Sequence, residues 1–401
     1  MTDDQIINRN RRDISTNDES NGIEKSEKTK NIKSSNGITD LVQIVSASGL
    51  GISFGILMNK ANVYLAPIIR DQMLFTRFTM IKMFLGAVGA SMLSSCIVIL
   101  VSEPTYRTAC NAFIHRNNRI HGFHLLIGGI LIGVGMVLAG SCPGTVFVQM
   151  GSGLQNSFIT CLGAICGVLF YYKFLSIRLT KDEVPKSSIV LQQLPELVGI
   201  KRIYLNLMFG SIFIGTAFVL EYFVPYKNDL ITPKGLHSLV GWPPVLCGIG
   251  VGSLQLFFIM LFKKSLGIST GFTVLVAQLC RMRFFKKLIP SLEPFTYGVQ
   301  NSLALLFALG AIGGSFIATV SENQFPLNEQ YGAGVWSSFF GGFLLSLGAR
   351  CAGGCTSGQG ISGVTHLLIG SLIATAGMFG GGMLFAAAYG LITKDWLFRA
   401  L

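Results

Sequence analysis

The sequence predicts an all-α polytopic membrane protein with nine long transmembrane helices and four short re-entrant helices, arranged as two inverted repeats. Composition is the first reason, because 50% of the 401 residues are hydrophobic and only 12% are charged, whereas soluble domains carry about 25% charged residues. Long apolar stretches and an internal repeat are the other two reasons. This composition excludes a soluble multidomain enzyme, a disordered chain and a secreted disulfide scaffold.

Nine apolar stretches are long enough, or nearly so, to cross about 30 Å of hydrocarbon. In chain order they are 41–58, 80–101, 122–141, 156–175, 203–223, 243–262, 297–320, 335–350 and 366–391. Four semi-apolar pieces, most of them punctuated by glycine or proline, are too short to span: 63–72, 143–153, 270–280 and 356–363. Irregular backbone persists at membrane depth only where protein or a water-filled cavity covers it. We therefore expect these pieces to be re-entrant helices.

The distribution of charge predicts the orientation. Residues 1–40 are polar, with 7 Lys or Arg and 8 Asp or Glu, and predict a disordered cytoplasmic tail. Lys and Arg favour cytoplasmic loops, and nine crossings from that tail place 23 of the 31 basic residues inside and 7 outside. We expect a cytoplasmic N-terminus, an external C-terminus and residence in the plasma membrane. The nine cysteines lie mostly in or beside apolar stretches, which indicates free thiols.

An internal repeat divides the chain. Gly128–Cys142 reads GGILIGVGMVLAGSC and Gly341–Cys355 reads GGFLLSLGARCAGGC, with seven of fifteen positions identical at a constant offset of 213 residues. The predicted organisation is a first membrane repeat at 41–175, a linker with one extra helix at 176–240 and a second membrane repeat at 241–395. Because four crossings return the chain to its starting side, the extra helix inverts the second repeat, as in many secondary transporters.

Both copies of the repeat end in the same chemistry. A long helix runs into small residues, then a cysteine, then residues that start a new helix, such as Pro143 after the first cysteine. Short helices that begin inside a membrane direct N–H groups and a positive dipole end at whatever lies there. The pattern predicts a site for a small anion beside a thiol. Its candidate residues are Ser141, Cys142, Thr145, Gly354, Cys355, Thr356 and Ser357.

Further polar residues lie close to this pattern. Arg350 precedes the second motif and either attracts the anion or holds the end of its helix. Ser269 and Thr270 follow the stretch 243–262 and are expected to line the path. Cys351 stands four residues before Cys355, but no nearby His or further Cys completes a four-ligand zinc set. We expect neither a metal nor a cofactor.

These motifs resemble the YeeE/YedE family of sulfur transport proteins. GARCAGGCTSGQGISG, AGSCPGT and the stretch 266–272 carry the resemblance, which runs over roughly residues 45–390. It implies an hourglass of nine long and four short helices and implies that Cys142 and Cys355 contact thiosulfate. The family's first motif has a cysteine six residues before an Arg-Asp pair. Arg70 and Asp71 are present here, and we expect them to pair, but Tyr64 occupies the cysteine's position.

The expected function is uptake of a sulfur-containing anion, most simply thiosulfate, through hydrogen bonds from neutral thiols. Tyr64 would supply a hydroxyl donor, and Cys351 is a further thiol that would compensate for the missing cysteine. A second interpretation is a membrane thiol oxidoreductase or sulfurtransferase partner with a persulfidated cysteine. A third is a channel for another small anion. Expected partners are the anion, the bilayer and a cytoplasmic sulfur-handling protein; we expect no enzymatic activity and no nucleic acid binding.

Overall fold

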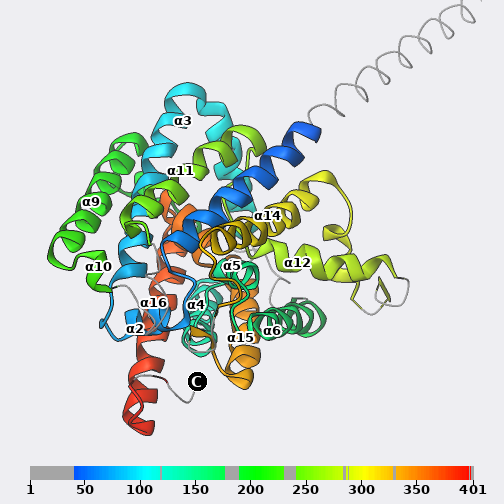
Figure 1. The fold of residues 1–401 in the computed structure, drawn as a ribbon. Coiled ribbons are helices and arrows are strands. Elements are labelled where there is room, and N and C mark those ends of the chain that lie inside the picture. Colours follow the sequence, from blue (N-terminus) through cyan, green and yellow to red (C-terminus); the bar gives the residue numbers. More distant parts are fainter. Residues whose placement is uncertain are drawn as a thin grey trace, which may run out of the picture. The chain divides into compact units, whose positions relative to one another are not determined.

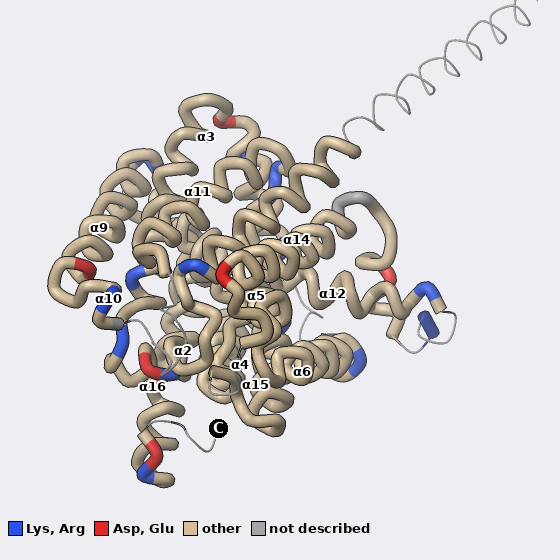
Figure 2. The backbone as a smooth tube through the Cα atoms, viewed as in Figure 1, with Lys and Arg blue, Asp and Glu red and all other residues tan. Residues whose placement is uncertain are grey.

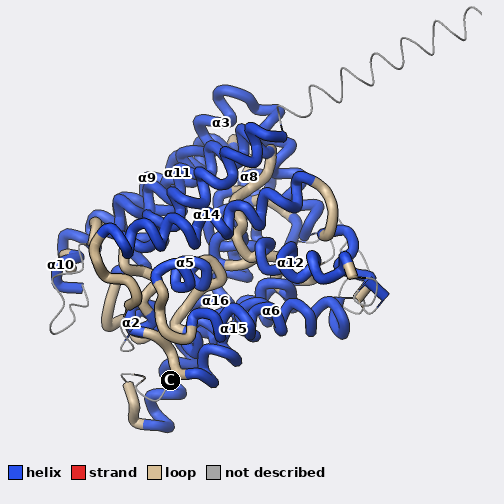
Figure 3. Tube along the Cα trace, turned by 45° about the vertical axis from the view of Figure 1, so that its right-hand side comes forward, coloured by secondary structure: helices blue, strands red, loops and turns tan. Residues whose placement is uncertain are grey.

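The computed structural model describes residues 40–117, 120–176, 189–229, 241–282, 286–287, 289–327, 331–396 and 398. The chain has two units, Met1–Ser46 and Ala47–Leu401, and every candidate site residue belongs to the second. The predicted disordered tail lies almost entirely outside the described residues. Within them the protein is helical and contains no strand, as the composition predicts (Figures 1 and 3).

Eight helices in the described part of the chain are long and apolar enough to cross a membrane. They are Asp40–Lys60, α3 (Thr79–Asn117), α4 (Gly122–Ala139), α6 (Ser157–Phe170, continued by η1, Tyr171–Leu175), α9 (Arg202–Phe223), α11 (Pro244–Phe262), α14 (Val299–Ser321) and α16 (Ile369–Thr393). The ninth predicted stretch forms α15 (Val335–Cys351), whose 17 residues stand at the lower limit of about 17–25 for a span. Nine crossings therefore remain a prediction.

The four short pieces predicted from the sequence are all helical. They form α2 (Ala66–Met73), α5 (Thr145–Ser152), α12 (Thr270–Ala277, continued by η3, Gln278–Arg281) and the π-helix η6 (Thr356–Gly363). Every residue of η6 is buried, and most residues of the other three are too. Short connecting helices complete the described elements: η2 (Ile189–Leu191), α8 (Leu194–Val198), α10 (Tyr226–Asp229) and η4 (Pro290–Phe295).

The second long helix extends beyond the apolar stretch 80–101 that predicted it. It consists of two helical segments joined at Ser102, whose φ of −155° and ψ of 84° are not helical. Pro104 begins the second segment, a position where its missing N–H costs no hydrogen bond. Glu103 and Arg107 pair on the exposed face. Hydropathy alone ends the helix too early because this polar second segment, which reaches Asn117, follows the apolar one.

Helices α4 and α15, which carry the two copies of the repeat, pack backbone against backbone. A Cβ atom on Gly135 would lie 2.8 Å from the backbone nitrogen of Leu345, and one on Gly348 would lie 2.8 Å from that of Ile132. Gly135 and Gly348 occupy the same position in the two copies of the repeat, and so do Ile132 and Leu345, because each pair is separated by 213 residues. The two contacts are therefore equivalent. Small residues allow this close approach between membrane helices.

The remaining long helices pack against this pair or against one another. α4 also lies against α16, α15 against α6, α3 against α11 and α9, and α14 against α5. Charged residues gather mainly at helix ends and in loops (Figure 2). The arrangement brings both cysteine motifs to the ends of one tightly packed helix pair.

Candidate functional site

The first cysteine follows the end of α4. Gly140 adopts a φ of +56° that reverses the chain after Ala139, and α5 begins at Thr145. The Cys142 N–H donates to Thr145 Oγ1 at 2.6 Å, and the Thr145 N–H donates to Cys142 Sγ at 3.4 Å. The Ser141 hydroxyl lies 3.1 Å from Thr145 Oγ1. Because its sulfur accepts a helical N–H, Cys142 caps α5 in the way that a serine or aspartate usually would.

The second cysteine repeats this geometry at the end of α15. Gly353, the equivalent of Gly140, has a φ of +66°. Cys355 immediately precedes η6, and its Sγ lies 3.1 Å from Ser357 Oγ. Each cysteine thus stands at the start of a short buried helix, next to a hydroxyl side chain two or three positions later.

A cavity of about 50 Å³, the small cavity, lies between the two cysteine turns. Cys142 and Thr145 come from the first turn, and Thr356 and Ser357 from the second. Apolar side chains, including Phe54 and Met83, complete its walls. Ser357 Oγ accepts the N–H of Ile268 at 3.3 Å. Cys355 is fully buried next to Ser357, so only one of the two thiols reaches the small cavity directly.

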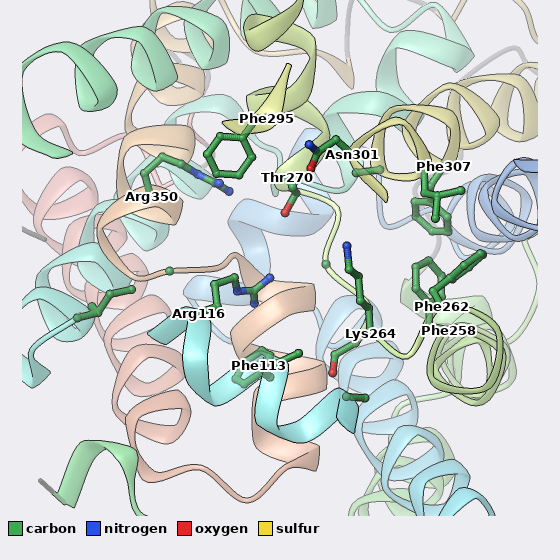
Figure 4. Close-up of a pocket in the computed structure, with 18 of the residues that line it drawn as sticks. Phe113, Arg116, Phe258, Phe262, Lys264, Thr270, Phe295, Asn301, Phe307 and Arg350 are labelled. Carbon is green, nitrogen blue, oxygen red and sulfur yellow. The ribbon is translucent and has the colours of Figure 1, made fainter. Parts of the chain in front are cut away.

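A second cavity of about 630 Å³, the basic cavity, is lined by Arg116, Lys264 and Arg350. Figure 4 shows these three side chains, from α3, the segment after α11 and the end of α15, directed into one space with Thr270. Arg350 Nη2 donates to Ser269 Oγ at 2.7 Å, while its buried Nε has no hydrogen-bond partner among the described residues. Ser269 in turn lies next to Cys355. Arg350 therefore links the basic cavity to the second thiol.

The basic cavity favours anions. Partial burial, and then the positive charge of Arg116, lower the pKa of the Lys264 ammonium below its usual value. No Asp or Glu is found among the described residues that line the cavity. Like charges that face one another without a carboxylate are relieved when an anion binds between them.

Some predicted site residues lie elsewhere. Tyr64 is 1% exposed in the apolar core and lines neither cavity. Cys351 packs with Tyr171 and Leu347, and Gly354 lies against the Gln359 side chain; neither lines the small or the basic cavity. The structure thus brings together the two cysteine turns, Ser269, Thr270 and Arg350, although Ser141, Ser269 and Cys355 also lie behind the cavity walls and not in them.

Buried polar side chains that the sequence did not single out hold the turns. Gln149 Nε2 donates to the carbonyls of Tyr64 and Gly140 at 2.7 and 3.0 Å. Gln359 Nε2 donates to the Ala352 carbonyl at 2.6 Å. Both amides satisfy backbone carbonyls near the end of a repeat helix, groups that would otherwise be buried unpaired.

Arg70 braces the first turn instead of pairing with its neighbour. Its Nε and Nη2 donate to the carbonyls of Val137 and Leu138 at 2.8 and 2.7 Å. Asp71 accepts a hydrogen bond from Arg77 at 2.8 Å. The expected Arg70–Asp71 pair is therefore wrong, because the last carbonyls of α4 are open acceptors that a guanidinium satisfies.

Arg116 and Lys264 were missed as site residues. Both were counted only as loop charges, although Arg116 belongs to the helical extension beyond residue 101. The signal that would have identified Arg116 is the apolar series Tyr106, Ala109, Cys110 and Phe113, which is helical in spacing and buried in the structure.

Comparison with known proteins identifies the family of the chain. The family described as Sulphur transport matches residues 60–384. The chain belongs to that family. It is similar to the thiosulfate transporter TsuA of Escherichia coli (strain K12), with 22% identity over 88% of this chain and 94% of that protein. TsuA of Spirochaeta thermophila is 22% identical over 81% of this chain and 93% of that protein.

A shorter relative matches part of the chain. A probable transporter of Xylella fastidiosa (strain 9a5c) is 28% identical over 37% of this chain and 96% of its own length. Family membership and eight long apolar helices in the described residues together make this an integral, multi-pass membrane protein of a transporter family.

Proposed function

We propose that the protein imports a sulfur-containing anion, thiosulfate in the first instance, through a path between the small cavity and the basic cavity. The observation that carries this proposal is the pair of cysteine turns, where Cys142 and Cys355 each stand at the start of a short buried helix. Both TsuA relatives are named as thiosulfate transporters. The path runs from Cys142, past Ser357 and Cys355, to Ser269 and Arg350.

The thiols suit this substrate because they are weak donors. Thiosulfate is a dianion with a soft terminal sulfur, and a neutral S–H is a polarizable, weak hydrogen-bond donor. Since the Cys142 sulfur accepts the Thr145 N–H, its own proton is free to point elsewhere, including toward the small cavity. Weak contacts at successive sites allow an ion to enter and to leave. Arg350 and the other two cations then attract the anion into the basic cavity.

The proposed architecture is an hourglass of nine crossings with two inverted repeats and four re-entrant helices. The reciprocal contacts of Gly135 and Gly348 and the left-handed Gly140 and Gly353 support the inversion. The basic cavity takes its three cations from positions that the charge count assigns to the cytoplasm. With the N-terminus in the cytoplasm and the protein in the plasma membrane, the basic cavity therefore lies on the cytoplasmic side and is the exit for the imported anion. A cytoplasmic sulfur-handling protein is the proposed receiver.

Uptake of radiolabelled thiosulfate into cells or vesicles tests the proposal. Cys142→Ala and Cys355→Ala are each expected to reduce uptake severely while the protein stays folded in the membrane, because a neutral hydrogen bond contributes only about 0.5–1.5 kcal/mol to stability. Cys247→Ala is the matched control, since Cys247 is equally buried and lines neither cavity. Uptake at the wild-type rate in either test variant would remove that thiol from the mechanism. Competition by sulfate and sulfite measures selectivity against other small anions.

The same geometry supports a second candidate function. A sulfur that accepts helical N–H groups is also suited to act as a nucleophile. In that reaction the cysteine sulfur forms a bond to the terminal sulfur of thiosulfate, the S–S bond of thiosulfate breaks, and sulfite leaves with the electron pair. The cysteine proton remains on the new persulfide. Mass spectrometry of Cys142 and Cys355 after exposure to thiosulfate separates the candidates, since transport without a mass increase of one sulfur atom excludes the persulfide.

A further inference from the structure

The basic cavity is much larger than an inorganic anion requires. Its volume of about 630 Å³ falls within the range of about 300–1,000 Å³ that is typical of sites for small organic ligands. The small cavity, which holds the proposed thiol site, has about 50 Å³. A sulfur dianion that fits beside Cys142 would leave most of the basic cavity unfilled.

Aromatic rings form much of the wall of the basic cavity. Phe258, Phe262 and Phe307 lie together, with the Phe258 ring centroid 5.3 Å from that of Phe262 and 5.1 Å from that of Phe307. Phe295 packs 5.8 Å from Tyr172, and both also line the cavity. Figure 4 shows Phe258, Phe262 and Phe307 grouped to one side of Lys264, and Phe295 beside Arg350. Flat apolar groups pack well against such rings.

The three cations provide the polar end of the same space. Arg116 and Lys264 are exposed in the cavity wall, and the described residues show neither in an ion pair with a carboxylate. The contact of the Arg116 guanidinium with the Phe113 ring, at 5.0 Å, leaves its N–H groups available. An apolar wall with a few convergent charged groups is the usual composition of a site for an organic ligand.

We propose that the basic cavity binds an amphipathic organic anion, a flat aromatic group with a sulfonate head. The head lies among Arg116, Lys264 and Arg350, and the ring packs against Phe258, Phe262 and Phe295. This inference shares the basic cavity with the proposed transport path but requires no transport.

Equilibrium dialysis with naphthalene-2-sulfonate and the purified full chain in detergent tests the proposal. We expect one saturable site per chain and at least tenfold weaker binding of the neutral analogue 2-naphthalenemethanol. Arg116→Gln and Lys264→Gln are each expected to weaken sulfonate binding about tenfold or more, since hydrogen bonds to charged groups contribute about 1.5–3 kcal/mol. Arg116→Lys retains the charge and retains binding. Arg107→Gln, on the same helix but outside the cavity wall, is the matched control.

The apolar half of the site has its own control. Phe262→Leu is expected to weaken binding several-fold, whereas Phe158→Leu, at a side chain 67% exposed, leaves it unchanged. Equal binding of the neutral analogue, or sulfate and thiosulfate binding as tightly as the sulfonate, overturns the proposal; the second result makes the cavity an inorganic anion site. Displacement of the sulfonate by anionic lipid but not by excess free benzenesulfonate assigns the cavity to lipid and also overturns it. Sulfonate binding that survives Cys142→Ala separates this test from failure of the transport proposal.

Discussion

Alanine at Gly135 or Gly348 tests how closely the two repeat helices must pack. In each case the new Cβ would lie 2.8 Å from a backbone nitrogen of the facing helix. The closest backbone atom lies at 2.8 Å for Gly135 and at 2.6 Å, the Gly128 oxygen, for Gly348, whereas ordinary contact begins at 3.4 Å; α4 and α15 must therefore separate by about 0.6–0.8 Å. Overpacking of this kind typically costs about 1–3 kcal/mol, offset by about 1 kcal/mol because alanine favours a helix over glycine.

The control for that prediction is Gly380→Ala in α16, where nothing lies within 4 Å of the added carbon. The control gains the same helix propensity from alanine but has no steric clash. Each test variant is therefore expected to be about 1–3 kcal/mol less stable than the control. Thermal unfolding of the purified protein in one detergent measures this difference. Because the contacts of Gly135 and Gly348 are equivalent, the two alanine variants should lose similar amounts of stability. Test variants as stable as Gly380→Ala, or one strongly affected and the other unaffected, would refute the reasoning.

Three other substitutions have definite expected outcomes. Tyr64→Phe should leave thiosulfate uptake within about twofold of wild type, since the ring lies outside both cavities. A large loss of uptake would show that the Tyr64 hydroxyl donates a hydrogen bond on the transport path. Arg70→Gln should lower stability by about 1–3 kcal/mol, because two buried carbonyls lose a charged donor, and unchanged thermal unfolding would contradict this role. Binding of sulfonate to the basic cavity should weaken as the pH rises past the lowered pKa of Lys264, since only the protonated ammonium attracts the anion. That decline should begin below the usual lysine value of about 10.4, and Tyr171 and Tyr172 are the other titratable side chains in the wall besides the two arginines. Lys264→Arg should abolish this decline in sulfonate binding. If the decline is unchanged in that variant, a group other than Lys264 causes it.

Hydropathy predicted most of the fold because a membrane imposes one dominant constraint. A helix must present about 20 apolar residues to cross, and the observed ends of α4 and α9 fall within two residues of the predicted ones. Glycine and proline also identified the short helices, including η6 with its correct bounds. The same reasoning misjudged α3, whose second segment is polar but continues as a helix to Asn117.

The site was only partly predictable because its supports are long-range. The cysteine motifs could be recognised from the internal repeat, because the two turns have the same local geometry and therefore similar local sequences. Arg116 and Lys264 meet across 148 residues of sequence, and nothing near either residue signals that encounter. The Gln149 and Gln359 amides likewise satisfy carbonyls whose positions depend on the packed fold.

On the proposed transport path, the difference in volume between the two cavities determines where the ion would exchange its water. About 50 Å³ beside Cys142 leaves little room for a hydration shell, so an ion arriving there must give up most of its water before it meets the thiol. About 630 Å³ on the other side allows that shell to re-form while the ion is still inside the protein. On the proposed path, an ion would therefore lose its water at the small cavity and regain it in the basic cavity. An anion that holds its water more tightly than thiosulfate, such as sulfate, would then meet its largest barrier at the small cavity, before it contacts the thiol.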